Sequence, residues 1–471
     1  MTKIRNLFNN INMTDGNLFT RIILFALPLM FTTIVQLFYV TIDLTTVSIG
    51  DSADSMAAIA SNSALINLII FVFVGTSVGA NVLISEARGA NNPEKAEKIM
   101  HTSLVFSVIA GIFVGVVGFI FSDDLLKMMG TEEHYFSKAA LYLKIYFVGL
   151  PFLMIYNYAA QILRGMGDSK SPLIALVISG AINVGFDSLF VFVFHMGVAG
   201  VAVATIISEI VSTAICIFIL HRGKHNYVNF SYKKLRIDGK CLKEVLKIGL
   251  PAGLQGFFFS LPNVFIQASL YTIDPGNIAL ENGATAASNI EGYFNAGVDA
   301  ISTAVMTFIA ANVGAKKKEN IKRIILFGFI WGTIYCGLLA AILALFHRPI
   351  LQLFVRDEES IAAGYERLMI MGYPYFFDFT MALTASILRG MKRSTYPMVT
   401  TMLCCSALRI LLIYTLFQVP EFHTIFWLYA LFPLTWVLAT LSNLVAIFIF
   451  IPKDLKKLDN QDINLEPALT K

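Results

Sequence analysis

The 471-residue sequence predicts an all-α polytopic membrane protein of about twelve transmembrane helices, arranged as two six-helix lobes. Three observations predict this class. Apolar residues make up 56% of the chain, charged residues 14%, and the mean hydropathy is +0.70, whereas a soluble domain carries roughly 25% charge. The apolar residues form segments of membrane length, since a helix needs about 20 residues to cross a bilayer. The second half of the chain also repeats the first.

Six apolar segments lie in each half, and each is expected to be one membrane helix. In order along the chain they lie near 17–45, 55–84, 96–122, 136–163, 170–195, 197–221, 245–272, 282–312, 321–347, 360–388, 395–419 and 424–451. The first segment is long and is not followed by a small-residue cleavage site, so we expect it to be retained. The predicted organisation is an N-terminus (1–16), a first lobe (17–221), a linker (222–244), a second lobe (245–451) and a polar tail (452–471).

A short motif repeats inside two of these segments. Ile162-Leu163-Arg164-Gly165-Met166 returns as Ile387-Leu388-Arg389-Gly390-Met391, at an offset of 387 − 162 = 225 residues. Gly89-Ala90 and Gly314-Ala315 have the same offset, as do Pro172 and Pro397. Membrane proteins made of two related halves usually bind their ligand between or within the halves and rock one half against the other. The repeat therefore indicates transport.

The loops predict the orientation, because Lys and Arg are retained on the cytoplasmic side of a membrane. Alternate loops are rich in basic residues, and the intervening ones are mainly acidic. Both termini and the basic segment 221–247 are therefore expected in the cytoplasm, with the chain in the plasma membrane. Topology alone explains the basic residues, so no nucleic-acid partner is expected.

Several absences narrow the function. The five cysteines include no Cys-x-x-Cys pair, and no His cluster has metal-ligand spacing, so neither a disulfide scaffold nor a zinc site is expected. The sequence has no phosphate-binding Gly-x-x-x-x-Gly-Lys-Ser/Thr loop and no catalytic array. We therefore expect no enzyme activity and no cofactor. Uphill transport would draw on an ion gradient or on a partner.

Acidic residues within the first lobe are candidate coupling groups, because an ionised group in hydrocarbon is costly and usually functional. Gln36, Tyr39 and Asp43 share one face of the first helix, so either polar neighbour could bond the carboxyl. Asn183 and Asp187 lie one turn apart in the fifth helix. Together these residues could bind a shared proton or Na⁺, although Asn183 could instead form an interhelical hydrogen bond.

The remaining candidates are a further first-lobe acid, a polar stripe in the second lobe and two prolines. Glu209, midway along the sixth helix, could join the same acidic pocket or contact substrate. The polar stripe in the eighth helix repeats every four residues, and together with Asp378 it could attract a cationic ligand. Arg409 could act as the countercharge of an acid in this stripe or form an internal salt bridge. Arg367, like Lys144, is expected to reach the membrane interface in a structural role. The stripe residues are Glu291, Asn295 and Asp299, and the hinge prolines are Pro28 and Pro251.

Several motifs together resemble the multidrug and toxic compound extrusion (MATE) family over nearly the whole chain. They are the repeated Leu-Arg-Gly and Gly-Ala, the Gly249-Leu250-Pro251 motif, and Asn183-x-x-x-Asp187 followed by Gly197-x-x-Gly200. The resemblance implies two lobes related by a pseudo-two-fold axis, a central cleft and cation-coupled export of organic cations or other amphipathic compounds. It also implies that Asp43, Asn183 and Asp187 form a cation or proton site, as in one prokaryotic branch.

The sequence departs from the family pattern at two places. Val40 stands where many members have Asn after the tyrosine. Asp378 matches an acidic cation-site residue of another branch, but Phe259 occupies the position of the glutamate that accompanies it there. Glu291 and Asp299 are the two candidates to take the place of that glutamate.

The expected function is a monomeric secondary active multidrug exporter that antiports amphipathic, cationic small molecules against H⁺ or Na⁺. Some of the 39 Phe and 17 Met residues would offer such ligands aromatic faces and adaptable thioethers. A flippase for a lipid-linked oligosaccharide is the alternative. That activity would need cationic clusters for a pyrophosphate, whereas the intramembrane charges here are mainly acidic.

Overall fold

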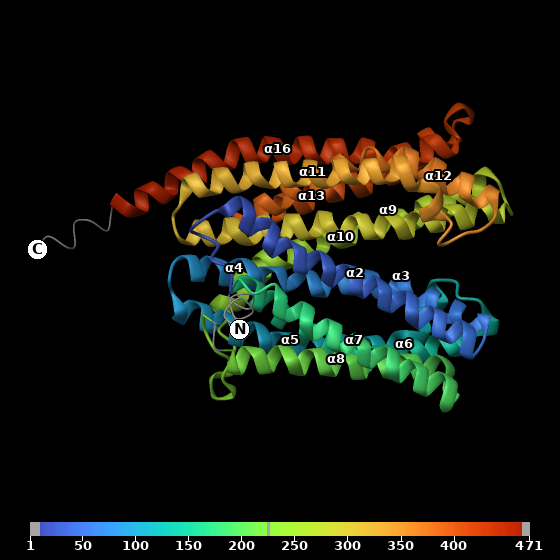
Figure 1. Ribbon diagram of the computed structural model, residues 1–471, viewed down its shortest axis with the longest axis horizontal. Helices are drawn as coiled ribbons and strands as arrows, with labels where there is room; N and C mark the ends of the chain where they lie inside the picture. Colours follow the sequence, from blue (N-terminus) through green and yellow to red (C-terminus); the bar gives the residue numbers. More distant parts are fainter. Residues whose placement is uncertain (1–9, 224–226, 464–471) are drawn as a thin grey trace, which may run out of the picture. The chain divides into compact units, whose positions relative to one another are not determined.

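A computed structural model describes residues 10–223 and 227–463, and the regular structure in these ranges is helical (Figure 1). Ten helical stretches among these residues are long and apolar enough to cross a membrane. The other two predicted spans are α9 (Gly239–Ile273) and the pair α12 (Glu358–Gly372) and α13 (Tyr375–Gly390). Polar residues lower the hydropathy of α9, and a break before Tyr375 divides the other span. The predicted all-α membrane fold is confirmed.

Large apolar side chains on the outside of the helices fit this environment. Phe113, Leu345 and Phe448 are 67%, 74% and 75% exposed. Extended apolar surface of this kind is rare on soluble monomers. These side chains are therefore expected to face lipid.

The described residues form two compact units, and each unit is discontinuous in sequence. Unit 1 holds residues 10–11 and Phe31–Leu250, and unit 2 holds Asn12–Met30 and 251–463. The chain passes from one unit to the other inside α2 (Leu18–Gly50) and again inside α9.

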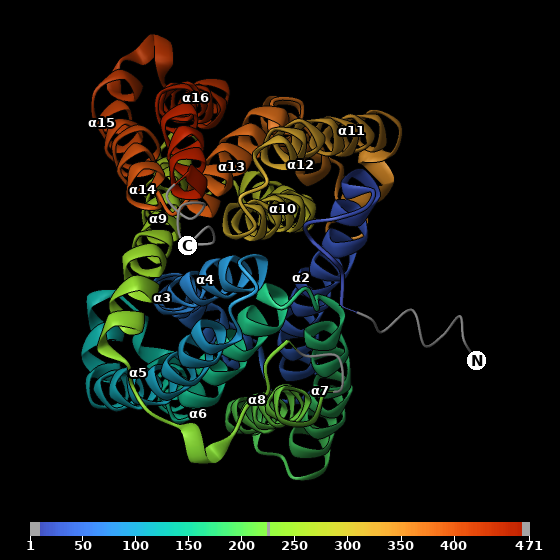
Figure 2. The same cartoon turned by 90° about the vertical axis from the view of Figure 1, so that its left-hand side faces the viewer.

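Unit 1 consists mainly of helices α3 to α8 (Figure 2). Their bounds are α3 Ala53–Thr76, α4 Val78–Gly89, α5 Pro93–Met128, α6 Glu133–Gly165, α7 Lys170–Ser188 and α8 Gly197–Arg222. Helix α6 packs along both α5 and α8, and α7 packs along α8. Gly111 and Gly115 permit the close approach of α5 and α6, because a Cβ atom would lie 2.6 Å from Pro151 Cα and 2.7 Å from the Phe147 oxygen, respectively.

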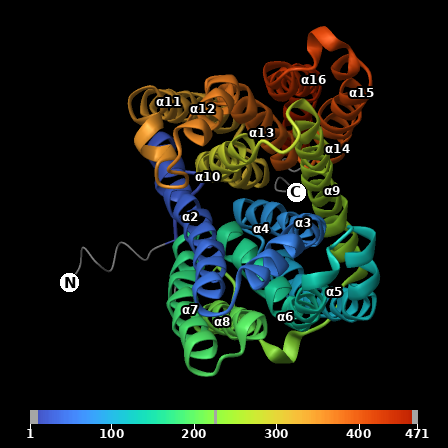
Figure 3. The same cartoon turned by 90° about the vertical axis from the view of Figure 1, so that its right-hand side faces the viewer.

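Unit 2 is built around α10 (Ile278–Gly314), which packs against α11 (Lys318–Leu351), α12 and α13 (Figure 3). Most of α10 is buried, as expected for a helix surrounded by others. The remaining helices of the unit are α14 Thr395–Thr400, α15 Leu408–Tyr414 and α16 Ile425–Ile463. A π-helical segment, Thr401–Ala407, lies between α14 and α15, and another, Leu189–Val193, follows α7 in unit 1. Such segments are frequent at functional sites.

The predicted first lobe, 17–221, is wrong at its beginning, because Asn12–Met30 belongs to unit 2. Side-chain contacts explain this assignment. Trp331 Nε1 donates to the Phe19 oxygen at 2.9 Å, and the Phe25 and Phe308 rings lie 5.6 Å apart. Asn312 Nδ2 also donates to the Met13 oxygen at 2.8 Å.

The predicted linker and tail also need correction. Helix α9 begins at Gly239, so the linker ends at Asp238 rather than residue 244. Its backbone is held by His101 Nε2, which accepts from Ser231 N at 3.0 Å, and by Thr102 Oγ1, which accepts from Asp238 N at 3.1 Å. Within the predicted polar tail, α16 continues to Ile463; residues 464–471 lie outside the described ranges.

Candidate functional site

Two carboxyl groups of unit 1 face each other. Asp43 lies in α2 and Asp187 near the end of α7, within hydrogen-bonding reach of one another. Asp187 is fully buried, and both of its oxygens and Asp43 Oδ1 lack a hydrogen-bond partner among the described residues. Two ionised carboxylates can only accept hydrogen bonds. A proton or a cation is therefore needed to make this contact favourable.

Asn183 and Thr205 complete this group. Asn183 lies one turn before Asp187, is 3% exposed, and its Nδ2 has no partner among the described residues. The interhelical hydrogen bond considered for Asn183 is therefore not made by its amide nitrogen. Thr205 lies beside Asp43, and its hydroxyl donates to the Val201 oxygen at 2.9 Å.

The two polar neighbours predicted for Asp43 are used differently. The Tyr39 hydroxyl donates to the Leu176 oxygen in α7 at 2.6 Å rather than to a carboxyl, and Gln36 is exposed. Gly180 makes room for the tyrosine ring, since a Cβ atom there would lie 1.6 Å from Tyr39 Cζ. Tyr39 therefore joins α2 to α7 and positions Asp43 indirectly.

Glu209 in α8 shares one aromatic neighbour with Asp43 and Asp187, and its predicted role stays a prediction. Tyr142 of α6 is within electrostatic range of Asp43, Asp187 and Glu209, and Tyr146 is within range of Glu209. The two tyrosine rings stack with centroids 6.4 Å apart. Sequence reasoning did not assign Tyr142 or Tyr146 to the site. Their spacing of four residues was the available signal, but it is common in membrane helices.

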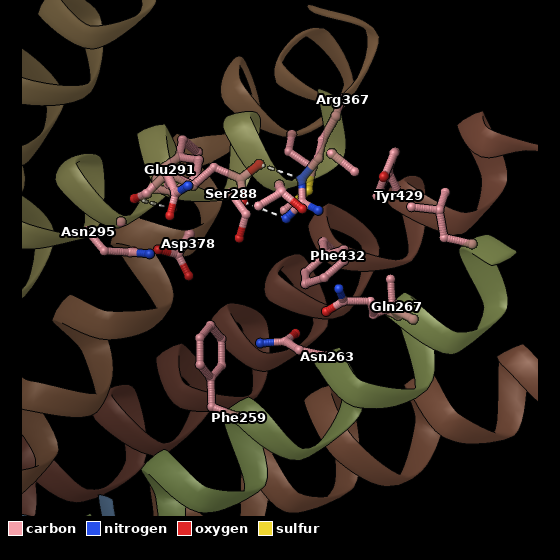
Figure 4. A pocket seen from close by; sticks show the side chains of 18 of the residues that line it. Phe259, Asn263, Gln267, Ser288, Glu291, Asn295, Arg367, Asp378, Tyr429 and Phe432 are labelled. Carbon is pink, nitrogen blue, oxygen red and sulfur yellow. Dashed lines mark hydrogen bonds and ion pairs between the residues drawn. The ribbon is translucent and has the colours of Figure 1, made fainter. Parts of the chain in front are cut away.

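Unit 2 contains a separate cavity of about 390 Å³ (Figure 4). Helices α9, α10, α12, α13 and α16 supply its wall. Amide side chains line one part of it, and aromatic rings another; the amides are Asn263, Gln267, Asn289 and Asn295, and the rings include Phe259, Tyr429, Phe432 and Trp436. A cavity of this size lies within the range of small-molecule sites, about 300–1,000 Å³.

An ion pair forms part of the cavity wall. Arg367 Nε donates to Glu291 Oε1 at 3.0 Å, and Arg367 Nη2 donates to Oε2 at 2.8 Å (Figure 4). The two side chains are 14% and 8% exposed, and the guanidinium lies 5.0 Å from the Tyr429 ring centre. The prediction that Arg367 reaches the interface is wrong, and Arg367, rather than Arg409, is the countercharge of Glu291.

Lys144, which was predicted to behave like Arg367, has a more accessible partner. Its Nζ donates to Asp123 Oδ2 at 2.8 Å, and the side chains are 33% and 45% exposed. This agrees with the predicted structural role near the end of a membrane helix.

Asp378 lines the cavity and is 3% exposed. The Asn295 amide points toward it from α10 (Figure 4). Asp299, one turn further along α10, is not part of the cavity wall; it lies within electrostatic range of Asp378 and Arg389 and is accessible to solvent. The predicted stripe is thus divided among an ion pair, an amide beside Asp378 and an acid beside Arg389.

Arg409 is fully buried directly behind the cavity wall. Its Nη2 donates to Thr435 Oγ1 at 2.6 Å, and its guanidinium lies 4.2 Å from the centre of the Phe432 ring. Arg409 is within electrostatic range of Asp378, but no ion pair joins them in the described structure. Arg409 therefore offsets the charge of Asp378 without direct contact.

The prolines proposed as hinges both lie inside helices, Pro28 in α2 and Pro251 in α9. Each is within a few residues of a boundary between the units, which fall at Met30/Phe31 and Leu250/Pro251. A proline removes a backbone hydrogen bond from its helix and permits bending.

The comparison with known proteins finds similarity in both halves of the chain. A family model described as MatE matches residues 28–189 and 251–415. The probable multidrug resistance protein YoeA of Bacillus subtilis is 28% identical over 382 residues, covering 80% of this chain and 82% of the relative. The probable multidrug resistance protein YpnP of the same organism is 26% identical over 365 residues, covering 77% and 80%.

A similar fold is found among solved structures. The crystal structure of MATE in complex with MaL6 has a TM-score of 0.85 and 21% sequence identity, and it covers 94% of this chain and 98% of that chain. The match to the family model extends over both halves and over more than half of the sequence. The chain belongs to the MatE family, which confirms the resemblance predicted from its motifs.

Proposed function

We propose that the protein is a secondary active exporter of amphipathic small molecules, coupled to the entry of protons through the pair of carboxyl groups in unit 1. The observation that carries the coupling proposal is the contact between Asp43 and Asp187, whose buried oxygens lack partners. The names of the relatives, which are multidrug resistance proteins, support the substrate class. The distribution of basic loops supports an orientation with both termini in the cytoplasm. The proposed exporter is a monomer in the plasma membrane.

In the proposed cycle, one proton is held between Asp43 and Asp187 in one conformation. Like charges in contact cannot both remain ionised at low cost, so a proton stabilises their approach. Loss of the proton to the cytoplasm would push the carboxylates apart and change the packing of α2 against α7. Since Tyr39 connects the same two helices, it would transmit this change along α2.

Glu209 is assigned to the proton-binding group rather than to the substrate. Thr205 and Glu209 are four residues apart on α8 and share one face, and Thr205 lies beside Asp43. Tyr142 lies near all three carboxyls. Within range of this group, no Lys or Arg of the described residues neutralises the acids.

Export of a dye by purified protein in liposomes, under separately imposed H⁺ and Na⁺ gradients, tests this function. A proton gradient should drive export in the wild type, and Asp187→Asn should abolish it while the protein remains folded. Asp124→Asn makes the same change at an exposed position at the end of α5 and should leave export unchanged. Export driven by Na⁺ alone, or full activity of Asp187→Asn, would contradict proton coupling at this site.

The prolines are proposed as hinges on the ground that both unit boundaries lie beside them. Pro28→Ala should slow the turnover of bound substrate more than it weakens binding. A loss of binding with unchanged turnover would make Pro28 a structural residue only.

A further inference from the structure

We propose that the linker between α8 and α9 lies in the headgroup layer of the membrane and binds anionic phospholipids. The inference goes beyond the proposed export function, because this contact with lipid needs neither a substrate nor an ion gradient. It rests on the depth at which residues 227–238 are held, on their exposed apolar side chains and on the surrounding charge.

The linker is held beside the end of the membrane-spanning part of α5 (Figure 2). Residues 104–121 of α5 contain no charged residue and extend over about 27 Å at 1.5 Å per residue, close to the hydrocarbon thickness of about 30 Å. His101 and Thr102, which accept hydrogen bonds from the backbone of Ser231 and Asp238, lie just before this run. The linker is therefore anchored about 3–5 Å outside the hydrocarbon, at the depth of the lipid headgroups.

The linker buries one aromatic ring and exposes three apolar side chains. Phe230 is buried, and its ring stacks on His101 with the centroids 5.5 Å apart. Tyr232, Leu235 and Ile237 are instead 64%, 44% and 44% exposed. Topology explains basic residues on this side of the membrane, but it does not explain exposed apolar side chains among them. Such side chains are typical of segments that lie in the membrane interface.

Basic residues alternate with these apolar ones and continue into the first turns of α9. Residues 232–247 include two acidic residues, Asp238 and Glu244, and six basic ones, Lys233, Lys234, Arg236, Lys240, Lys243 and Lys247. Clusters of about four to eight basic residues directly at the end of a membrane helix bind anionic lipid headgroups. Lys234 is paired with Glu97 at 2.5 Å, which attaches the linker to α5 once more. Lys233 and Arg236 are exposed beside the apolar side chains.

The environment of a fluorescent probe on the linker tests this contact. The probe is a nitrobenzoxadiazole group attached to Leu235→Cys in the full-length protein in lipid nanodiscs. Cys241 and Cys404, which are only partly buried, are replaced by Ser so that the new thiol is labelled selectively. The probe emits at shorter wavelength when it leaves water. Its emission should be at shorter wavelength in discs of equal parts phosphatidylcholine and phosphatidylglycerol than in discs of phosphatidylcholine alone.

The same probe on Glu94→Cys provides a reference position. Glu94 is exposed in the first turn of α5 and lies about 12 Å further from the hydrocarbon than Thr102, so its emission should not depend on the lipid. Both leaflets of a nanodisc have the same composition, so the result is independent of the orientation of the chain. Raising the salt concentration from about 0.1 to 1 M shortens the Debye length from about 10 to 3 Å and should reduce the lipid-dependent shift.

Variants then locate the charge that recognises the lipid. Lys233→Gln with Arg236→Gln should abolish the lipid-dependent shift of the probe at residue 235, while the ion pair of Lys234 stays intact. The matched control is Lys456→Gln with Lys457→Gln, which removes the same charge from exposed positions near the end of α16. The control should leave the shift unchanged.

Three outcomes would overturn the proposal. Equal emission of the probe at residue 235 in both kinds of disc would show that the linker does not recognise anionic lipid. A shift of the same size when inorganic phosphate is added to phosphatidylcholine discs would assign the basic residues to free phosphate. A lipid-dependent shift that survives in the Lys233/Arg236 double variant would place its origin elsewhere in the chain. None of these measurements involves export, so failure of the proposed function would leave them unchanged.

Discussion

Replacing Arg367 by Gln should destabilise the protein strongly, because it leaves the Glu291 carboxylate buried without its cation. The pair is bidentate, with N···O distances of 3.0 and 2.8 Å, and the side chains are 14% and 8% exposed. Removing one partner of such a pair costs about 3–5 kcal/mol, whereas replacing both partners by neutral residues can cost little. Arg367→Gln should therefore lose about 3–5 kcal/mol, and adding Glu291→Gln should restore most of this loss.

The free energy of unfolding can be measured by titrating the protein in mixed micelles with sodium dodecyl sulfate and following helicity. Arg348→Gln serves as the control, because its partner Glu358 is largely exposed and such surface pairs contribute only about 0–1 kcal/mol. The reasoning is refuted if Arg367→Gln costs no more than this control. It is also refuted if the double variant loses the sum of the two single losses, since the two charges would then be independent.

Two further predictions concern a helix contact and the N-terminal segment. Gly180→Ala should destabilise the protein by about 1–3 kcal/mol through overpacking, because the new Cβ would meet the Tyr39 ring. The control Gly185→Ala, whose Cβ would have no atom within 4 Å, should stabilise α7 by up to about 1 kcal/mol. Equal effects of the two substitutions in the same unfolding assay would contradict this explanation. Lys317 donates a hydrogen bond to Asp15 and holds the pKa of that carboxyl below its ordinary value of 3.8. This contact thus stabilises the folded segment above pH 3.8, and its contribution disappears as the pH falls through the lowered folded-state pKa. The protection of residues 12–16 against hydrogen exchange, relative to the intrinsic exchange rate at each pH, should fall over that range. Lys317→Gln should reduce this pH dependence, because Lys317 contributes most to the lowered pKa of Asp15. Unchanged protection in both proteins would show that the contact does not hold the segment.

Much of the fold could be predicted from sequence because lipid imposes a simple requirement on each segment. A long apolar run must satisfy its backbone internally, so each predicted span became helical. The division of α2 between two units could not be predicted. It depends on tertiary contacts such as Trp331 with Phe19, which leave no pattern in the local sequence.

The candidate sites were predictable to different extents. Asp43 and Asp187 could be placed together, because acids within apolar segments have few tolerable environments. The partner of Glu291 could not be found in the same way. The sequence indicated Arg409 as a countercharge and placed Arg367 at the membrane interface, whereas in the structure Arg367 bonds the carboxylate. Tyr39 was misassigned for a similar reason, since sharing a helix face with Asp43 does not prevent its hydroxyl from reaching a neighbouring helix.

The two related halves of the chain have diverged in how they treat buried acids. In unit 1, Asp43 and Asp187 lie together with no basic neighbour among the described residues, whereas in unit 2 arginines accompany Glu291 and Asp378. After duplication, one half could therefore specialise in binding the coupling proton while the other half adapted to the substrate. Under the proposed function, substitutions in the wall of the unit 2 cavity leave the carboxyl pair of unit 1, which drives export, unchanged. Natural selection could then broaden or shift the resistance spectrum of such an exporter by substitutions in one half alone.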